Sequence, residues 1–163
     1  MRLPHSLASV VIPPLLGLYA RTGLSRHGDE PARLRSILRT YPFWGPGHQK
    51  LGEAALHAGD VATAYASAQA ARILSDKKPR AKAQAMHLLG RCFLARGDWQ
   101  GALHFLKEAR TSLPSDSRIQ QDEAAALMLG GEHAAALEIL SAIPEKMLSA
   151  DGKAAREYLR AKA

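Results

Sequence analysis

The sequence predicts an all-α fold in which helical hairpins stack in a row, and two observations support this. A glycine followed by an acidic residue recurs at Gly28-Asp29, Gly59-Asp60, Gly97-Asp98 and Gly131-Glu132, with spacings of 31, 38 and 34 residues. Each pair lies between two stretches of helical periodicity, where glycine can end one helix in the left-handed conformation and the acid can cap the next. Alanine is abundant and aromatics make up only 6% of the residues. This composition suits closely packed helices better than sheets.

Length, cysteine content and charge limit the classes of protein that need to be considered. The 163 residues are enough for one domain with its own core, and the single cysteine, Cys92, excludes an internal disulfide and favours a reducing compartment such as the cytoplasm. The net charge of +7 is concentrated at the front, with +4 in residues 1–44 and −1 in residues 117–163. Such a charge attracts an acidic partner, an anionic membrane surface or a nucleic acid, although a solvated surface is the simpler interpretation.

Residues 6–20 form a mostly apolar run near the N-terminus. The run is shorter than the roughly 20 residues of a membrane-spanning helix, and Pro13-Pro14 interrupts it. It also lacks a small-x-small cleavage site. We therefore expect Pro14 to begin a helix that packs on the body as part of a divergent helical pair, residues 14–25 and 30–40, within an N-terminal segment 1–44. A signal peptide or membrane anchor at residues 6–20 is the alternative.

The clearest repeat unit spans residues 80–115. Before its Gly97-Asp98 turn lie Met86, Leu89-Gly90 and Phe93, and after it lie Ala102, Leu106, Ala109 and Pro114. This pattern resembles the tetratricopeptide repeat, with Met86 in place of the usual Trp and Leu106 in place of the usual Phe. Units 46–79 and 116–148 match less closely, and Glu123 stands where the family has Leu. The signature residues of the three units are Leu51, Gly52, Gly59, Ala64, Leu89, Gly90, Phe93, Gly97, Ala102, Leu106, Pro114, Gly131 and Ala136.

The resemblance implies a right-handed α-α superhelix of about three repeats over residues 45–148. One unit cannot bury its apolar face alone, so the stacking of units has to supply the core. Small residues such as Gly90 and Ala102 are expected where the two helices of a unit cross. We expect residues 41–47 to form a rigid break before the first repeat, with aromatics that fill the seam. A capping helix in residues 149–163 is expected to pack down through Tyr158 and Leu159.

In the tetratricopeptide family the first helices of successive units line a concave groove that holds a peptide or a helix of another protein. Carried over position by position, this groove comprises Gln49, Glu53, Leu56, His57, Gln84, His87, Arg91, Leu94, Gln121, Ala125 and Met128. We expect Glu53 and Arg91 to face each other, either as a salt bridge or as contacts for charges on the partner. Gln49 and Glu53 stand where some members use Lys and Asn to clamp a C-terminal carboxylate, so that binding mode is not expected here.

The sequence offers no recognisable catalytic or cofactor motif. It has no phosphate loop, dinucleotide turn or nucleophile elbow, so we expect neither an enzyme nor a small-molecule substrate. His57, His87 and Glu53 are possible metal ligands, but no short His–Cys spacing accompanies them, and we expect no metal or other cofactor. Cys92 is expected to be a small buried filler of the core.

We therefore predict a cytoplasmic scaffold, adaptor or assembly chaperone that binds another protein. One alternative is a membrane-associated or exported assembly or secretion factor that uses residues 6–20 as its anchor and the repeats as its reader. Another is a basic protein that binds a polyanion or nucleic acid through Arg33, Arg35 and Arg39, which fall roughly on one side of a helix. The arginines lack the interleaved aromatics of a base-stacking surface, which makes nucleic acid the less favoured partner.

Overall fold

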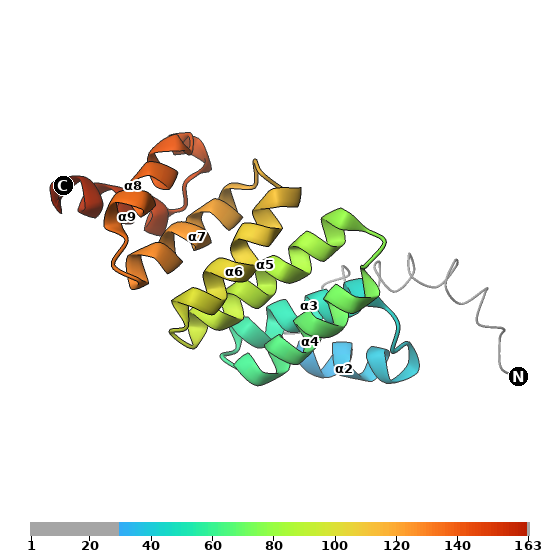
Figure 1. Cartoon of the computed structure of the whole chain (residues 1–163). Helices are drawn as coiled ribbons and strands as arrows, with labels where there is room; N and C mark the ends of the chain where they lie inside the picture. The colour runs from blue at the N-terminus through green and yellow to red at the C-terminus, as the bar shows by residue number, and fades with distance from the viewer. Residues whose placement is uncertain (1–29, 163) are drawn as a thin grey trace, which may run out of the picture.

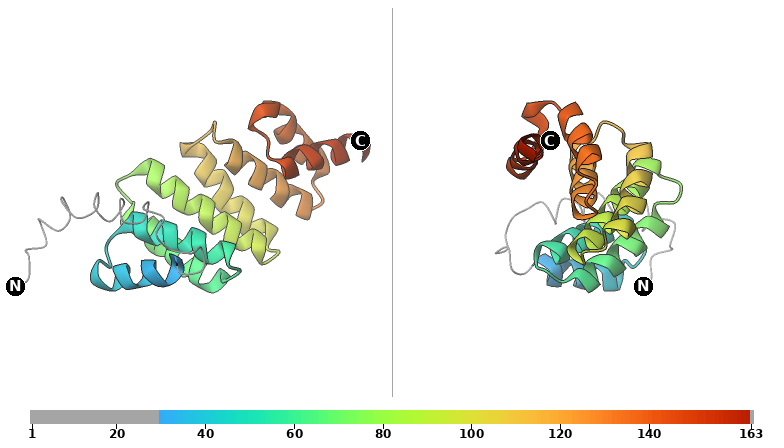
Figure 2. Two further views of the ribbon diagram at one scale, coloured as in Figure 1. Left: turned by 180° about the vertical axis from the view of Figure 1, so that it is seen from behind. Right: turned by 60° about the vertical axis from the view of Figure 1, so that its left-hand side comes forward.

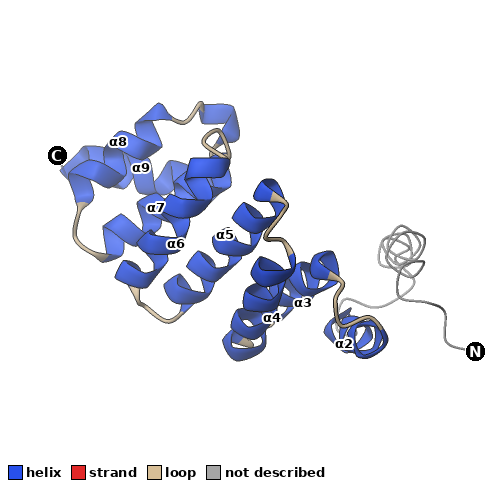
Figure 3. Ribbon diagram, turned by 45° about the vertical axis from the view of Figure 1, so that its right-hand side comes forward, coloured by secondary structure: helices blue, strands red, loops and turns tan. Residues whose placement is uncertain are grey.

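The computed structural model describes residues 30–162, and these residues form helices joined by short turns (Figure 3). The helices are α2 (Glu30–Thr40), α3 (Gly45–His57), α4 (Val61–Leu74), α5 (Pro79–Ala95), α6 (Trp99–Ser112), α7 (Ser117–Leu129), α8 (His133–Ala142) and α9 (Ala150–Lys162), with a 3-10 turn at Glu145–Met147. No strand occurs between residues 30 and 162, and the predicted all-α fold is confirmed. The helix expected at residues 14–25, the apolar run 6–20 and the pair Gly28-Asp29 lie outside the described residues.

The helices form antiparallel hairpins that stack in a row, with α2 and α9 at opposite ends (Figures 1 and 2). The pairs α3–α4, α5–α6 and α7–α8 are the hairpins, and α4 packs on α5 and α6 on α7 to join each hairpin to the next. The first helices also contact one another, α3 with α5 and α5 with α7. They therefore form one layer of the stack, which places side chains of equal register next to each other.

The three described glycine–acid pairs build their turns by the same backbone bonds. Gly59, Gly97 and Gly131 have φ angles of +80°, +75° and +81°. At the second turn, the amide of Gly97 donates to the carbonyl of Leu94, and the amide of Asp98 donates to the carbonyl of Phe93, which closes α5 in a Schellman motif. The Asp98 carboxylate then accepts from the amide of Gly101 and caps α6. Asp98 thus closes α5 through its backbone amide and caps α6 through its carboxylate.

This capping geometry is not identical at all three turns. The Asp60 carboxylate accepts from the Thr63 amide. Hydrogen bonding from the side chain of Thr63, and after it from this amide, lowers the pKa of Asp60. Glu132 occupies the same place before α8 but makes no side-chain cap. Its amide still bonds to the carbonyl of Leu127, so the turn keeps its backbone bonds without the carboxylate.

Replacing Gly97 by alanine is expected to lower the free energy of unfolding by about 1–2 kcal/mol, because an L-residue is strained at φ +75°. No atom lies within 4 Å of the added Cβ, so the effect comes from the backbone alone. Urea unfolding followed by circular dichroism measures it. Gln100→Ala, three residues later at an exposed position of α6, is the matched control and should change the stability by less than about 0.5 kcal/mol. Equal effects of the two substitutions would contradict the assigned role of the glycine.

Small residues let the two helices of a hairpin approach closely, as the sequence predicts. A Cβ placed on Gly90 would lie 2.6 Å from Leu106 Cγ and 3.4 Å from the carbonyl oxygen of Ala102. A Cβ placed on Gly52 would lie 3.2 Å from the carbonyl oxygen of Ala64. The helix crossings therefore fall at the expected glycine and alanine positions.

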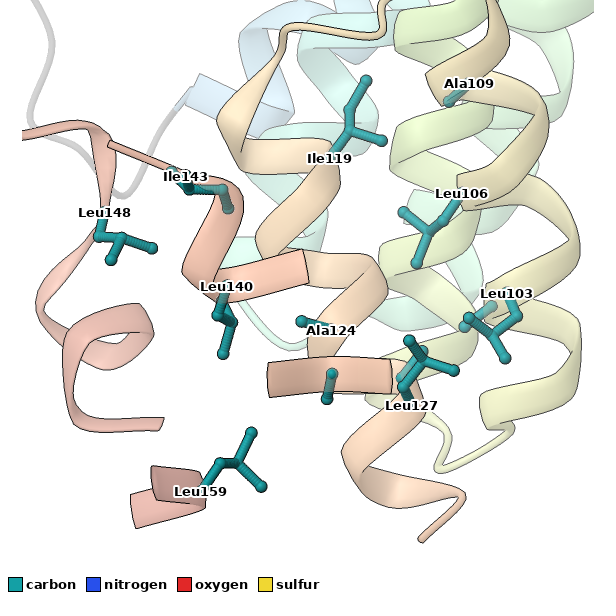
Figure 4. Close-up of a cluster of buried hydrophobic side chains, with 13 residues drawn as sticks. Leu103, Leu106, Ala109, Ile119, Ala124, Leu127, Leu140, Ile143, Leu148 and Leu159 are labelled. Carbon is teal, nitrogen blue, oxygen red and sulfur yellow. The ribbon is translucent and has the colours of Figure 1, made fainter. Parts of the chain in front are cut away.

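The largest apolar cluster runs through α6, α7 and α8 into the capping helix (Figure 4). Its buried leucines and isoleucines are Leu103, Leu106, Ile119, Leu127, Leu140, Ile143, Leu148 and Leu159. Leu159 packs on this core as expected, but Tyr158 does not, because its side chain is 54% exposed. The expectation for Tyr158 was wrong because adjacent residues of a helix point about 100° apart, so only one of the two can face the core.

The segment before the first repeat also differs in detail from the prediction. Helix α3 already begins at Gly45 with Pro46 in its first turn, so the break predicted over residues 41–47 is shorter. Trp44 is buried against Leu34, Leu38 and Leu51 and fills the seam between α2 and α3. Phe43, its neighbour, is exposed.

Candidate protein-binding face

One stripe of side chains recurs at equal register on α3, α5 and α7. Gly52, Gly90 and Ala124 set the register, because each is buried and lies five residues before the last residue of its helix. The stripe contains the predicted groove residues together with Leu129: Gln49, Glu53, Leu56 and His57 on α3; Gln84, His87, Arg91 and Leu94 on α5; and Gln121, Ala125, Met128 and Leu129 on α7. None of these side chains is buried. We call this stripe the first-helix face.

Polar side chains of the first-helix face link α3 to α5. Gln49 Nε2 donates to Glu53 Oε1 at 2.7 Å and to the backbone carbonyl of Gln84 at 3.4 Å. Its Oε1 atom is buried against the protein and accepts no hydrogen bond. The amide of Gln49 is therefore engaged within its own chain.

A second polar link joins α5 to α7. His87 Nε2 lies 2.6 Å from Asp122 Oδ2, and Arg91 Nε lies 3.9 Å from the same oxygen. This geometry corrects the expected pairing of Glu53 with Arg91, because Arg91 approaches Asp122 while Glu53 accepts from Gln49. Asp122 was missed because the sequence pattern pairs only residues at equal register positions of successive first helices. The residue that meets His87 instead comes one position after Gln121.

The third link joins α7 to the segment before α9. Gln121 Oε1 accepts from the amide and the hydroxyl of Ser149 at 2.8 and 2.7 Å. Its Nε2 donates to the carbonyls of Ser117 and Met147. Gln49, His87 and Gln121 share one register position, so each first helix uses the same position to bond to the element that follows it in the stack.

The opposite end of the first-helix face is apolar. Leu56, Leu94 and Met128 share one register position and are each half-buried against the core. Leu129 ends α7 with 58% of its surface exposed. The face therefore has a polar row near the middle of the helices and an apolar row near their C-terminal ends.

A buried ion pair lies between the second and third repeats, outside this face. Glu123 is only 2% exposed, and Arg110 Nη1 lies 3.0 Å from its Oε2. Burial raises the pKa of Glu123, while the positive charges of Arg110 and Lys107 act in the opposite direction. Arg110 also lines an open depression between α6 and α7, with Lys107, Thr111, Pro114 and Gln120, so water reaches one side of the pair.

The remaining candidate groups offer little chemistry. Cys92 is fully buried, as expected, and burial raises the pKa of its thiol, whereas reactive cysteines are accessible and have a lowered pKa. His57 is exposed, whereas His87 pairs with Asp122, so the two do not form the metal site considered from the sequence. Within residues 30–162 no three His, Cys, Asp or Glu side chains are arranged to hold a metal ion, and no helix is long and apolar enough to cross a membrane.

Helical hairpins that stack in one direction, each turning at a left-handed glycine and crossing at small residues, define a helical-repeat protein. The sequence model of the tetratricopeptide repeat family matches residues 93–159, a segment that contains the turns at Gly97-Asp98 and Gly131-Glu132. Residues 93–159 thus match the tetratricopeptide repeat family, as the sequence pattern predicts. Comparison with curated proteins finds no similar sequence. Tetratricopeptide repeats generally mediate contacts between proteins, and the family is typically not enzymatic.

Proposed function

We propose that this protein binds a segment of another protein across the first-helix face and acts as a scaffold, adaptor or assembly chaperone. The observation that supports the proposal is the apolar row of Leu56, Leu94 and Met128, which recurs on the first helices of three successive hairpins and stays partly exposed. A folded domain gains stability when such a row is covered, and a peptide or helix of a partner provides the cover. We propose the cytoplasm as its compartment, on the basis of the single buried thiol.

Two other functions remain as alternatives. A membrane-associated or exported factor would depend on residues 6–20, which lie outside the described residues. Polyanion binding would depend on α2, where Arg35 already lies 3.3 Å from Asp60 and loses part of its positive field to that carboxylate. Binding to a polyanion falls steeply as salt is raised, so a salt titration separates this alternative from the proposed function.

Replacing Ala125 by arginine tests the proposed site. Ala125 is exposed on α7 at the register of Glu53 and Arg91, so a long charged side chain there would obstruct a guest without disturbing the core. We expect partner capture from cells of the native source to fall at least about tenfold, equivalent to about 1.4 kcal/mol of binding free energy. Quantitative mass spectrometry of the captured proteins provides the measurement.

Ala134→Arg is the matched control, because Ala134 is equally an exposed helical alanine but lies on α8, the second helix of the same hairpin. Capture should be unchanged by it, and thermal unfolding should show both variants folded. Equal capture by wild type and Ala125→Arg would place the binding site elsewhere on the molecule.

A further inference from the structure

We infer that the guest of the first-helix face is an amphipathic α-helix and not an extended segment; this inference rests on the proposed function. The two kinds of guest differ in what they need from the protein. An extended segment brings unpaired backbone amides and carbonyls and needs hydrogen-bonding side chains to receive them. A helix pairs its own backbone and needs mainly an apolar surface for one of its faces.

The polar side chains at the register position shared by the three first helices, Gln49, His87 and Gln121, are already engaged. Gln49 donates to Glu53 and to a backbone carbonyl of α5, while its Oε1 is buried. Gln121 uses both ends of its amide on residues 117, 147 and 149. His87 lies at hydrogen-bond distance from Asp122. An extended guest would have to break these bonds at all three successive repeats.

The charged side chains of the face are also engaged by neighbours on α3 and α7. Asp122, beside the face, lies 2.6 Å from His87 and 3.9 Å from Arg91, and Glu53 accepts a hydrogen bond from Gln49. The contacting side of the guest therefore needs no net charge, even though the whole chain carries +7. We expect binding to depend little on ionic strength, because few unpaired charges are covered.

The apolar row matches the spacing of a helix. Packed neighbouring helices lie about 8–10 Å apart, and two turns of an α-helix rise about 10–11 Å. A guest helix crossing α3, α5 and α7 would thus place an apolar residue against Leu56, Leu94 and Met128 at about every seventh position. The exposed Leu129, next to Met128, widens the row at its C-terminal end.

A displayed library of random peptides of about 20 residues, long enough to cover about 30 Å as a helix, tests the inference with the full-length chain as the target. The selected peptides are then tested for binding to two variants of the chain, Leu129→Glu and Ile73→Glu. Both leucine and isoleucine are exposed, at 58% and 66%, so neither change should disturb folding. Leu129 lies on the first-helix face, whereas Ile73 lies on α4.

We expect the enriched peptides to repeat apolar residues at helical spacing and to gain helical circular dichroism when they bind. They should bind Leu129→Glu at least about tenfold more weakly and bind Ile73→Glu as they bind the wild type. A different outcome would be peptides that lose binding to Leu129→Glu and yet lack a helical period or carry a central proline. Such peptides would overturn the inference that the guest is a helix and would leave the proposed function standing. Peptides that bind Leu129→Glu fully would overturn both. Failure to enrich any peptide would also overturn the inference of a helical guest, because the apolar row and its spacing should select an amphipathic helix from the library.

Discussion

Shortening Leu106 to alanine is expected to lower the free energy of unfolding by about 2–5 kcal/mol. The side chain is fully buried and fills the space where α5 and α6 cross, next to the core residues of α7 (Figure 4). Gly90, which faces Leu106, has no side chain that could move into the cavity. Guanidinium unfolding, followed by circular dichroism and by tryptophan fluorescence, measures the loss and shows whether the repeats unfold together.

A double-mutant cycle with Gly90→Ala tests the cause of this effect. A Cβ at position 90 lies 2.6 Å from Leu106 Cγ, so Gly90→Ala alone should destabilise by about 1–3 kcal/mol through overpacking. Alanine is the better helix former by about 1 kcal/mol, and this advantage should appear once Leu106 has been shortened. We therefore expect Gly90→Ala to be harmful in the wild type and neutral or stabilising in Leu106→Ala. Additive effects would show that the two residues do not share this space.

Removing the partner of the buried carboxylate is the second large effect. Arg110→Met should lower the free energy of unfolding by about 2–3 kcal/mol at neutral pH, because the buried carboxyl of Glu123 is left without its nearest positive charge. This figure is below the range of about 3–5 kcal/mol for fully buried pairs, since the Arg110 side chain is 40% exposed and water screens the pair. Thermal and urea unfolding across a pH series measure it.

The pH dependence has a definite sign. Burial raises the pKa of Glu123 in the folded state, so the folded chain binds the proton more tightly than the unfolded chain. The protonated carboxyl of Glu123 therefore favours folding at pH values below the ordinary pKa of a glutamate. This contribution to the free energy of unfolding is lost as the pH rises through the raised pKa of the folded state. Arg110→Met removes a charge that lowers this pKa, so its destabilisation should shrink as the pH falls from neutral into the acid range.

Glu123→Leu provides the matched control, because it restores the residue usual for the family at this position. Replacing a buried ion pair by a well-packed apolar side chain is often neutral or stabilising, by up to about 4 kcal/mol. We expect the variant to be at least as stable as the wild type and to lose the pH dependence. A strong destabilisation by Glu123→Leu would show that the ion pair stabilises this interface beyond what apolar packing could supply.

Local rules were sufficient to predict the helices and their turns. A glycine that must adopt positive φ, followed by an acid that caps the next helix, needs no distant partner, and all three described pairs have this backbone geometry. The small residues at the crossings could be predicted for the same reason, since a close approach of two backbones permits only glycine or alanine. The family pattern then supplied the order of stacking.

The sequence by itself determined where the chain bends back at the three described glycine–acid pairs and which small residues lie where the helices cross. Only the tertiary structure decided which polar side chains meet across the first helices: Arg91 approaches Asp122 instead of Glu53, and Glu123 is buried beside Arg110. The physical reason is that a turn depends on contacts between near neighbours in the chain. A pair between adjacent repeats instead depends on the tilt and offset of two packed helices, which the whole core sets.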